Sequence, residues 1–160
     1  MAIDRTFLRI ANIFPGVKIV LEKFFNKYDS IAEAGLFKQG APVAKTVSVT
    51  LTAAEILPPT GGLITGNQAA AGAAAYTLPL GSDLEIALVA ANPDLAVGDA
   101  FYLTIVNLSA VAAEVITLTT NTGWTLAGDM TLAAVAAGDQ SSGTFLVRRT
   151  GAGTFTAHRI

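Results

Sequence analysis

The sequence contains no cysteine, one histidine and one tryptophan, and only 14% of its 160 residues are charged. The absence of cysteine excludes a disulfide framework, thiol chemistry and any cysteine-ligated metal site. The low charge, together with an apolar fraction of 52%, excludes a disordered chain, because disorder requires low hydrophobicity and high charge. A net charge of −2 provides no overall electrostatic reason to bind nucleic acid. The length predicts one domain with an arm attached.

The longest uncharged run, residues 56–82, does not predict a membrane span. It contains three prolines and several glycines, which do not suit one apolar helix in lipid. Near the amino terminus, Arg5 and Arg9 precede any apolar stretch, and Pro15 and Gly16 interrupt the apolar residues after them. We therefore expect neither a membrane partner nor a secretory signal, so the protein should stay where it is made.

Charge divides the chain into two unlike parts. Residues 1–45 carry seven basic and four acidic side chains, a net charge of +3, whereas residues 46–147 carry eight acids and no base. This asymmetry predicts an arm over residues 1–45 and a separate domain over residues 46–160.

The arm is apolar and rich in phenylalanine. Val17, Val20, Leu21, Phe24 and Tyr28 recur at spacings of three or four, which predicts an amphipathic helix over residues 17–28. The rings of its five phenylalanines must be buried, either on the chain's own domain or on a neighbouring subunit or another protein. The candidate partner-interface residues are Arg5, Phe7, Phe14, Val17, Val20, Leu21, Phe24, Phe25, Tyr28 and Phe37.

The second part is predicted to be mainly β. Residues 46–51 alternate between polar and apolar, as expected for a strand with one solvent-exposed face. A Gly-rich loop over residues 150–153 indicates a hairpin. Many short strands with such loops favour a small β-sandwich or barrel-like domain, preceded by the partly helical arm. The further predicted strands cover residues 74–78, 100–107, 114–119, 130–135, 143–149 and 154–159.

One short helix interrupts the predicted strands. Ser82 and Glu85 match a capping box, and Asn92 followed by Pro93 ends the apolar pattern, so the helix is expected over residues 83–91. It should lie across an open end or edge of the sheet. Residues 68–75 are alanine-rich, but Gly66 and Gly72 favour a loop leading into a strand.

The residues most often used in catalysis form no recognisable site. His158 lies near the end of a predicted strand without a nucleophile and carboxylate motif around it, so it is expected to be exposed on an edge. The acids of residues 83–99 are too dispersed for a calcium loop, and Gly151 and Gly153 lie between strands, as in a turn. We therefore predict no catalytic residue, cofactor or metal. We also expect no small-molecule substrate, so the protein should not be an enzyme.

Four other positions have structural interpretations. Trp124 is expected to be buried beneath the strands. Arg148 and Arg149 are adjacent on a strand and should point to opposite faces, one toward an acid or an interface and the other toward solvent. Asn107 begins a glycosylation acceptor pattern that we discount without a secretory signal.

Several short motifs resemble the small structural proteins of tailed bacteriophages. They are AAYTLP at residues 74–79, VGDAF at 97–101, VN at 106–107, GWTLAG at 123–128 and TGAGTF at 150–155. The resemblance covers about residues 46–160 and is greatest to capsid decoration, or cement, proteins, which form trimers on the outside of the phage head. It implies a homotrimer, a major capsid protein as partner, a location on the virion exterior and synthesis in the host bacterial cytoplasm. No catalytic residues come with it.

The composition is compatible with such a role. The 29 alanines and 15 glycines allow close approach of strands and subunits but fill little volume, so neighbours should complete some apolar surface. Three copies around a closed axis would bury equivalent surfaces without leaving a growing end. The alternative is a trimeric phage fibre, tail or receptor-binding component.

Overall fold

The structure is a computed structural model that describes residues 39–58, 61–69, 72–138 and 140–160. These residues form a mainly β domain of two sheets with one short helix and a minor one, which confirms the predicted fold class. Its compact unit begins at Gln39, and the first strand, β1 (Val43–Lys45), lies just before residue 46.

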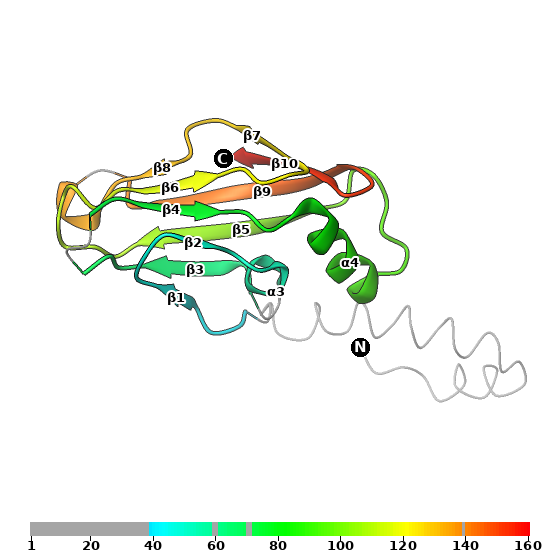
Figure 1. The fold of residues 1–160 in the computed structure, drawn as a ribbon, viewed down its shortest axis with the longest axis horizontal. Helices are drawn as coiled ribbons and strands as arrows, with labels where there is room; N and C mark the ends of the chain where they lie inside the picture. The colour runs from blue at the N-terminus through cyan, green and yellow to red at the C-terminus, as the bar shows by residue number, and fades with distance from the viewer. Residues whose placement is uncertain (1–38, 59–60, 70–71, 139) are drawn as a thin grey trace, which may run out of the picture. The chain divides into compact units, whose positions relative to one another are not determined.

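The chain alternates between the two sheets as it advances (Figure 1). The six-stranded sheet has the order β1-β3-β5-β9-β10-β7, and the four-stranded sheet has the order β2-β4-β6-β8. The remaining bounds are β2 (Val49–Thr50), β3 (Leu63–Gly66), β4 (Ala74–Thr77), β5 (Ala100–Asn107), β6 (Ile116–Thr119), β7 (Trp124–Ala127), β8 (Thr131–Leu132), β9 (Ser142–Gly151) and β10 (Thr154–Arg159).

Neighbouring strands in the first half are parallel because of this alternation. β1, β3 and β5 run parallel in one sheet, and β2, β4 and β6 run parallel in the other. Parallel neighbours need a crossover connection, and here the intervening strand of the opposite sheet supplies it. The chain therefore crosses between the sheets at both ends of the domain.

Two groups of connections result from this winding. The loop end consists of the β1–β2, β3–β4, β5–β6 and β8–β9 connections, the last of which contains the 3₁₀ helix η1 (Val135–Ala137). The opposite, helix end includes α3 (Ala53–Ile56) and α4 (Gly81–Ala91). The predicted position of the short helix at one end of the sheet is confirmed (Figure 1).

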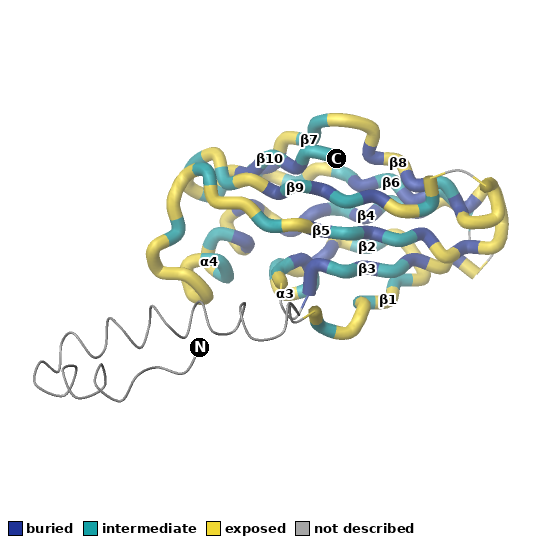
Figure 2. The backbone as a smooth tube through the Cα atoms, turned by 180° about the vertical axis from the view of Figure 1, so that it is seen from behind, coloured by how far each residue is buried: buried dark blue, intermediate teal, exposed yellow. Residues whose placement is uncertain are grey.

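The core lies between the two sheets and continues beneath α4. Buried positions alternate along the strands, as with Ile116 and Leu118 in β6 or Phe145 and Val147 in β9 (Figure 2). Trp124 is buried as predicted: its Nε1–H donates to the Pro79 carbonyl at 2.7 Å, and its ring lies 5.4 Å from that of Phe155.

Several predicted boundaries are wrong. The sequence pattern does not predict the strands β1, β3 and β7. The segment expected as one strand over residues 46–51 contains only the two residues of β2, and the one expected over residues 130–135 is a two-residue strand followed by η1. α4 begins at Gly81 with Leu80 as its N-cap, so Ser82 and Glu85 do not form the expected capping box, whereas its predicted end at Ala91, before Asn92, is confirmed. A capping interaction occurs instead at α3, where the Thr52 backbone N–H donates to the Glu55 carboxylate at 2.9 Å.

Candidate interaction surfaces

All ten predicted partner-interface residues lie outside the described residues. They are Arg5, Phe7, Phe14, Val17, Val20, Leu21, Phe24, Phe25, Tyr28 and Phe37. The candidate surfaces that the structure describes therefore come from other parts of the chain.

Within the described ranges, the titratable side chains do not converge on a metal-binding group. Among the acids of residues 83–99, Glu85 pairs with an arginine, and the Asp99 carboxylate accepts a hydrogen bond from the Ala96 backbone N–H at 2.8 Å. Both acids thus take part in contacts that stabilise the domain.

Arg148 and Arg149 point to opposite faces of β9, as predicted. Arg148 is exposed, whereas Arg149 lies on the inner face and donates twice to the Glu85 carboxylate, at 2.9 Å from Nε and 2.5 Å from Nη2. These hydrogen bonds lower the pKa of Glu85, and the same pair raises the pKa of Arg149. The pair joins α4 to the six-stranded sheet across 64 residues of sequence.

Replacing Glu85 with glutamine should lower stability at neutral pH and have no effect in strong acid. Because the folded pKa of Glu85 is depressed, its contribution is complete above the unfolded value of about 4.3 and is lost as the pH falls through the folded pKa. Urea unfolding of both proteins at pH 7 and pH 2.5 checks this. A midpoint difference that is the same at both pH values would contradict it.

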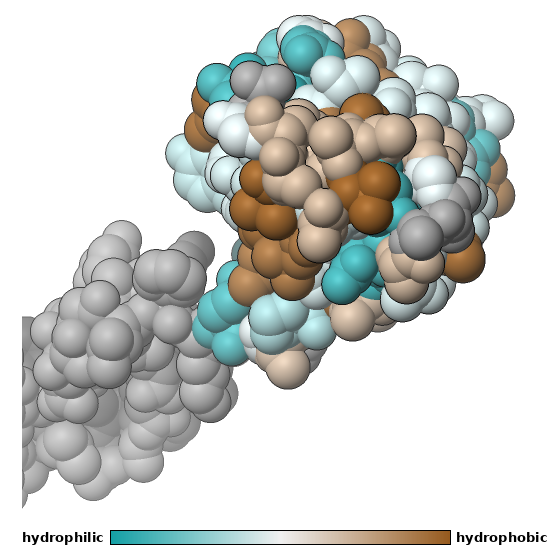
Figure 3. Space-filling view, turned by 90° about the vertical axis from the view of Figure 1, so that its left-hand side faces the viewer, coloured by the Kyte–Doolittle hydropathy of each residue, from teal (hydrophilic) through white to brown (hydrophobic). Residues whose placement is uncertain are grey.

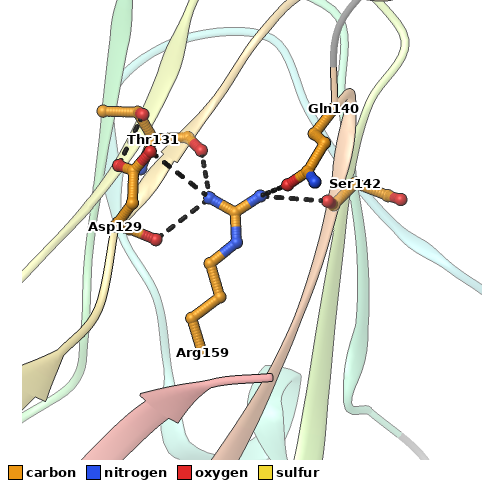
Figure 4. Close-up of polar contacts among 5 residues, drawn as sticks. All are labelled: Asp129, Thr131, Gln140, Ser142 and Arg159. Atoms are coloured by element: carbon orange, nitrogen blue, oxygen red, sulfur yellow. Dashed lines mark hydrogen bonds and ion pairs between the residues drawn. The ribbon is translucent and has the colours of Figure 1, made fainter.

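Arg159 closes the side of the domain between β8 and β9 (Figure 4). Its Nη1 donates to the carbonyls of Asp129 at 3.0 Å and Thr131 at 2.5 Å, and its Nη2 donates to the Gln140 Oε1 at 3.1 Å and the Ser142 carbonyl at 3.3 Å. A planar guanidinium serves such divergent acceptors better than an ammonium group can. Arg159 therefore joins β8 and the residues before it to the start of β9 and the residues before that strand.

His158 is not on an edge, which corrects the prediction. β10 lies between β9 and β7, and His158 is paired in register with Leu146 and Ala127. It is half-buried on the outer face of the six-stranded sheet, in a row that also includes the exposed Tyr102 of β5.

The loop end presents a continuous apolar surface (Figure 3). Its largest exposed apolar side chains are Leu108, Val111 and Val135, at 49%, 46% and 53% exposure, with Val47 in the β1–β2 connection. Of the described residues in its four connections, Glu114 is the one with a charged side chain, and it is buried. The exposed alanines of this end are Ala69, Ala73, Ala110, Ala112, Ala113, Ala136 and Ala137.

Buried polar side chains hold the loop end in place. The Asn107 amide donates to the carbonyls of Glu114 at 2.7 Å and Leu132 at 3.1 Å, and its oxygen accepts from the Ser109 N–H. The Ser109 hydroxyl accepts from the Gln68 N–H at 3.0 Å, which ties two connections together. Asn107 is fully buried, so the glycosylation pattern that it begins is inaccessible in the folded domain. The apolar surface is thus supported by a fixed polar scaffold.

Glu114 is an unusual member of this scaffold. It is 1% exposed, and its Oε1 has no hydrogen-bond partner among the described residues. Burying an unpartnered polar atom costs about 1–3 kcal/mol, and more for a charged group.

Replacing Glu114 with methionine should therefore stabilise the domain by about 1–3 kcal/mol, because an apolar side chain of similar length needs no partner. Chemical denaturation measures the change. The control is Gln68→Met, which removes a satisfied donor to the Tyr76 hydroxyl and should destabilise. Destabilisation by Glu114→Met would show that the carboxylate is satisfied.

Sequence reasoning missed the loop end, although a signal was present. The four connections are unusually rich in alanine and poor in charge for surface loops, as in SAVAAEV at residues 109–115. Only the winding of the chain brings them together.

Comparisons of the chain with protein-family models, with curated proteins and with solved structures found no match. Over the described residues, α3 and α4 are both too short to be candidates for a membrane-spanning helix.

Proposed function

We propose that this chain is a structural virion protein that binds the outer surface of a phage capsid as a trimer and stabilises contacts between capsomers. The observation that carries the proposal is the loop end, a contiguous exposed apolar surface with one charged side chain, which is buried, among its described residues. Exposed apolar patches of this kind are typical of protein interaction sites. The phage-like motifs of residues 74–155 supply the class of partner.

Trimerisation would raise the affinity of such a patch for the shell. A stable protein interface buries about 800 Å² on each partner, and a few apolar side chains and alanines on one copy provide only part of that area. Three copies joined around an axis present three loop ends to the shell at once. The second and third contacts then form at high effective concentration, which raises the overall affinity.

The proposed partners are other copies of this chain and the major capsid protein, and the proposed location is the capsid exterior. Synthesis would take place in the host bacterial cytoplasm. In this role the protein binds its partners through apolar contacts and uses no cofactor, substrate or reaction.

The test has two parts, both on the full chain. Sedimentation at micromolar concentration should give a trimer, and mixing with phage heads that lack the protein should give hundreds of bound copies, visible on the head surface by electron microscopy. A monomer that leaves the heads bare would overturn the proposal. A few copies at the tail would instead support the trimeric fibre, tail or receptor-binding alternative.

A further inference from the structure

α4 lacks the polar outer face that a surface helix usually has. Leu84 points inward and is fully buried, yet Ile86 and Val89 on other sides are 70% and 43% exposed. A helix with apolar residues all round is normally covered on every side. Of its two charged residues, Glu85 is already engaged by Arg149.

An open hollow of about 270 Å³ lies beside this helix and leads toward the core. Phe101, Val147 and Phe155 of the six-stranded sheet line it, together with Leu88 of α4 and Leu95 of the following connection. An apolar cavity of roughly 150 Å³ is large enough to bind benzene. The hollow therefore has room for one aromatic side chain.

The walls of the hollow are held in place before anything enters. The α4–β5 connection is fastened to β9 by backbone hydrogen bonds from Gly98 to Arg149 at 3.0 Å and from Arg149 to Asp99 at 2.9 Å. The rim is acidic overall: Asp99 lines the hollow and Asp94 is exposed in the same connection, whereas the charge of Arg149, which also lines the hollow, is already paired with Glu85. A preorganised apolar site with an acidic rim fits an aromatic residue next to a base.

We propose that the hollow receives Phe24 from a second copy of this chain. Residues 1–38 carry six basic and four acidic side chains, net +2, whereas residues 39–160 carry four basic and eight acidic ones, net −4. The helix predicted over residues 17–28 would place Phe24 on its apolar face. Lys27, three residues on, would then be its neighbour and would reach the acidic rim. The inference rests on the proposed self-association and names the contact that produces it.

The absence of native cysteine makes the contact directly testable by crosslinking. Full-length Phe24→Cys and Leu95→Cys chains are mixed, oxidised and run on a denaturing gel. A reductant-sensitive heterodimer, well above that formed when Thr125→Cys replaces Leu95→Cys, is expected. No crosslink above this control overturns the proposal. So does a double variant, Phe24→Cys with Leu95→Cys, that crosslinks only within one chain.

A second measurement separates this inference from the proposed function. Ala91→Phe places a ring into the hollow from α4 itself, and it should weaken self-association at least about tenfold in sedimentation. The control, Ala152→Phe, adds an exposed ring in the β9–β10 turn and should leave association unchanged. If the Ala91→Phe chain still forms trimers that bind phage heads, the Phe24 contact is wrong while the proposed function stands. A wild-type chain that neither associates nor binds heads overturns both.

Discussion

Replacing Gly81 with alanine is expected to destabilise the domain by about 2–4 kcal/mol. Gly81 begins α4 and packs against Gly123, before β7, and Gly153, in the β9–β10 turn. A Cβ at Gly81 would overlap the Gly153 carbonyl oxygen and lie 3.1 Å from the Gly123 Cα. Because these atoms are backbone, relief requires moving the helix away from the hairpin, which also loosens the Arg149–Glu85 pair.

Urea denaturation of the full chain measures this loss, with Gly138→Ala as the matched control. Gly138 follows η1 at a φ of 73°, and a Cβ there meets no atom within 4 Å. Its replacement therefore carries only the left-handed backbone cost of about 1–2 kcal/mol. If Gly81→Ala costs no more than Gly138→Ala, the close approach of the three glycines does not constrain the fold.

The local structure of this domain could be predicted where one segment alone determines it. Residues 100–107 and 143–149 were correctly predicted as strands, and the glycines of residues 150–153 correctly indicated the hairpin between β9 and β10. The alternation in residues 46–51 was misleading, because only the two residues of β2 form a strand there. Adjacent residues on a strand must point to opposite faces, so the separation of Arg148 from Arg149 followed from the sequence alone. The strand pattern does not predict that Glu85 is the acid with which Arg149 pairs.

Long-range packing accounts for the errors. Glu85 fitted a capping box with Ser82, but Arg149 offers its carboxylate two charge-assisted hydrogen bonds, which are stronger than one bond to a backbone N–H. The start of α4 is instead determined where Gly81 meets two other turns. His158 was expected on an edge because the last strand of a chain often lies there. In the structure, β7 pairs in parallel with β10 and covers the edge on which His158 was expected. The four residues of β7 carry no sequence pattern that predicts this pairing.

The loop end shows the same limit on the scale of a surface. In the sequence, each of its connections is a separate alanine-rich loop. The sequence pattern does not predict which of the two sheets the next strand joins. Once the strands alternate between sheets, four connections must emerge at one end. A surface of interaction thus arises from the winding of the chain rather than from any one motif.

Introducing glutamate at Val111 and Val135 together is expected to weaken binding to phage heads at least about 100-fold. Both side chains are about half exposed, so the core between the sheets should be unaffected. In contact with the shell, however, two carboxylates would lose water without gaining a partner, and uncompensated buried charge costs several kcal/mol. Since about 1.4 kcal/mol corresponds to a tenfold change in affinity, even partial desolvation gives this loss.

Co-sedimentation with heads that lack the protein, at one fixed salt concentration, measures the effect. The control adds the same two charges at Thr125 and Thr154, which are exposed on the outer side of the six-stranded sheet. Both double variants should keep the wild-type trimer and unfolding midpoint, because neither changes α4 or the core. If both lose binding equally, the shell repels negative charge in general, and if neither does, the loop end does not contact it. A loss confined to Val111→Glu with Val135→Glu identifies apolar contact at the loop end as the source of affinity.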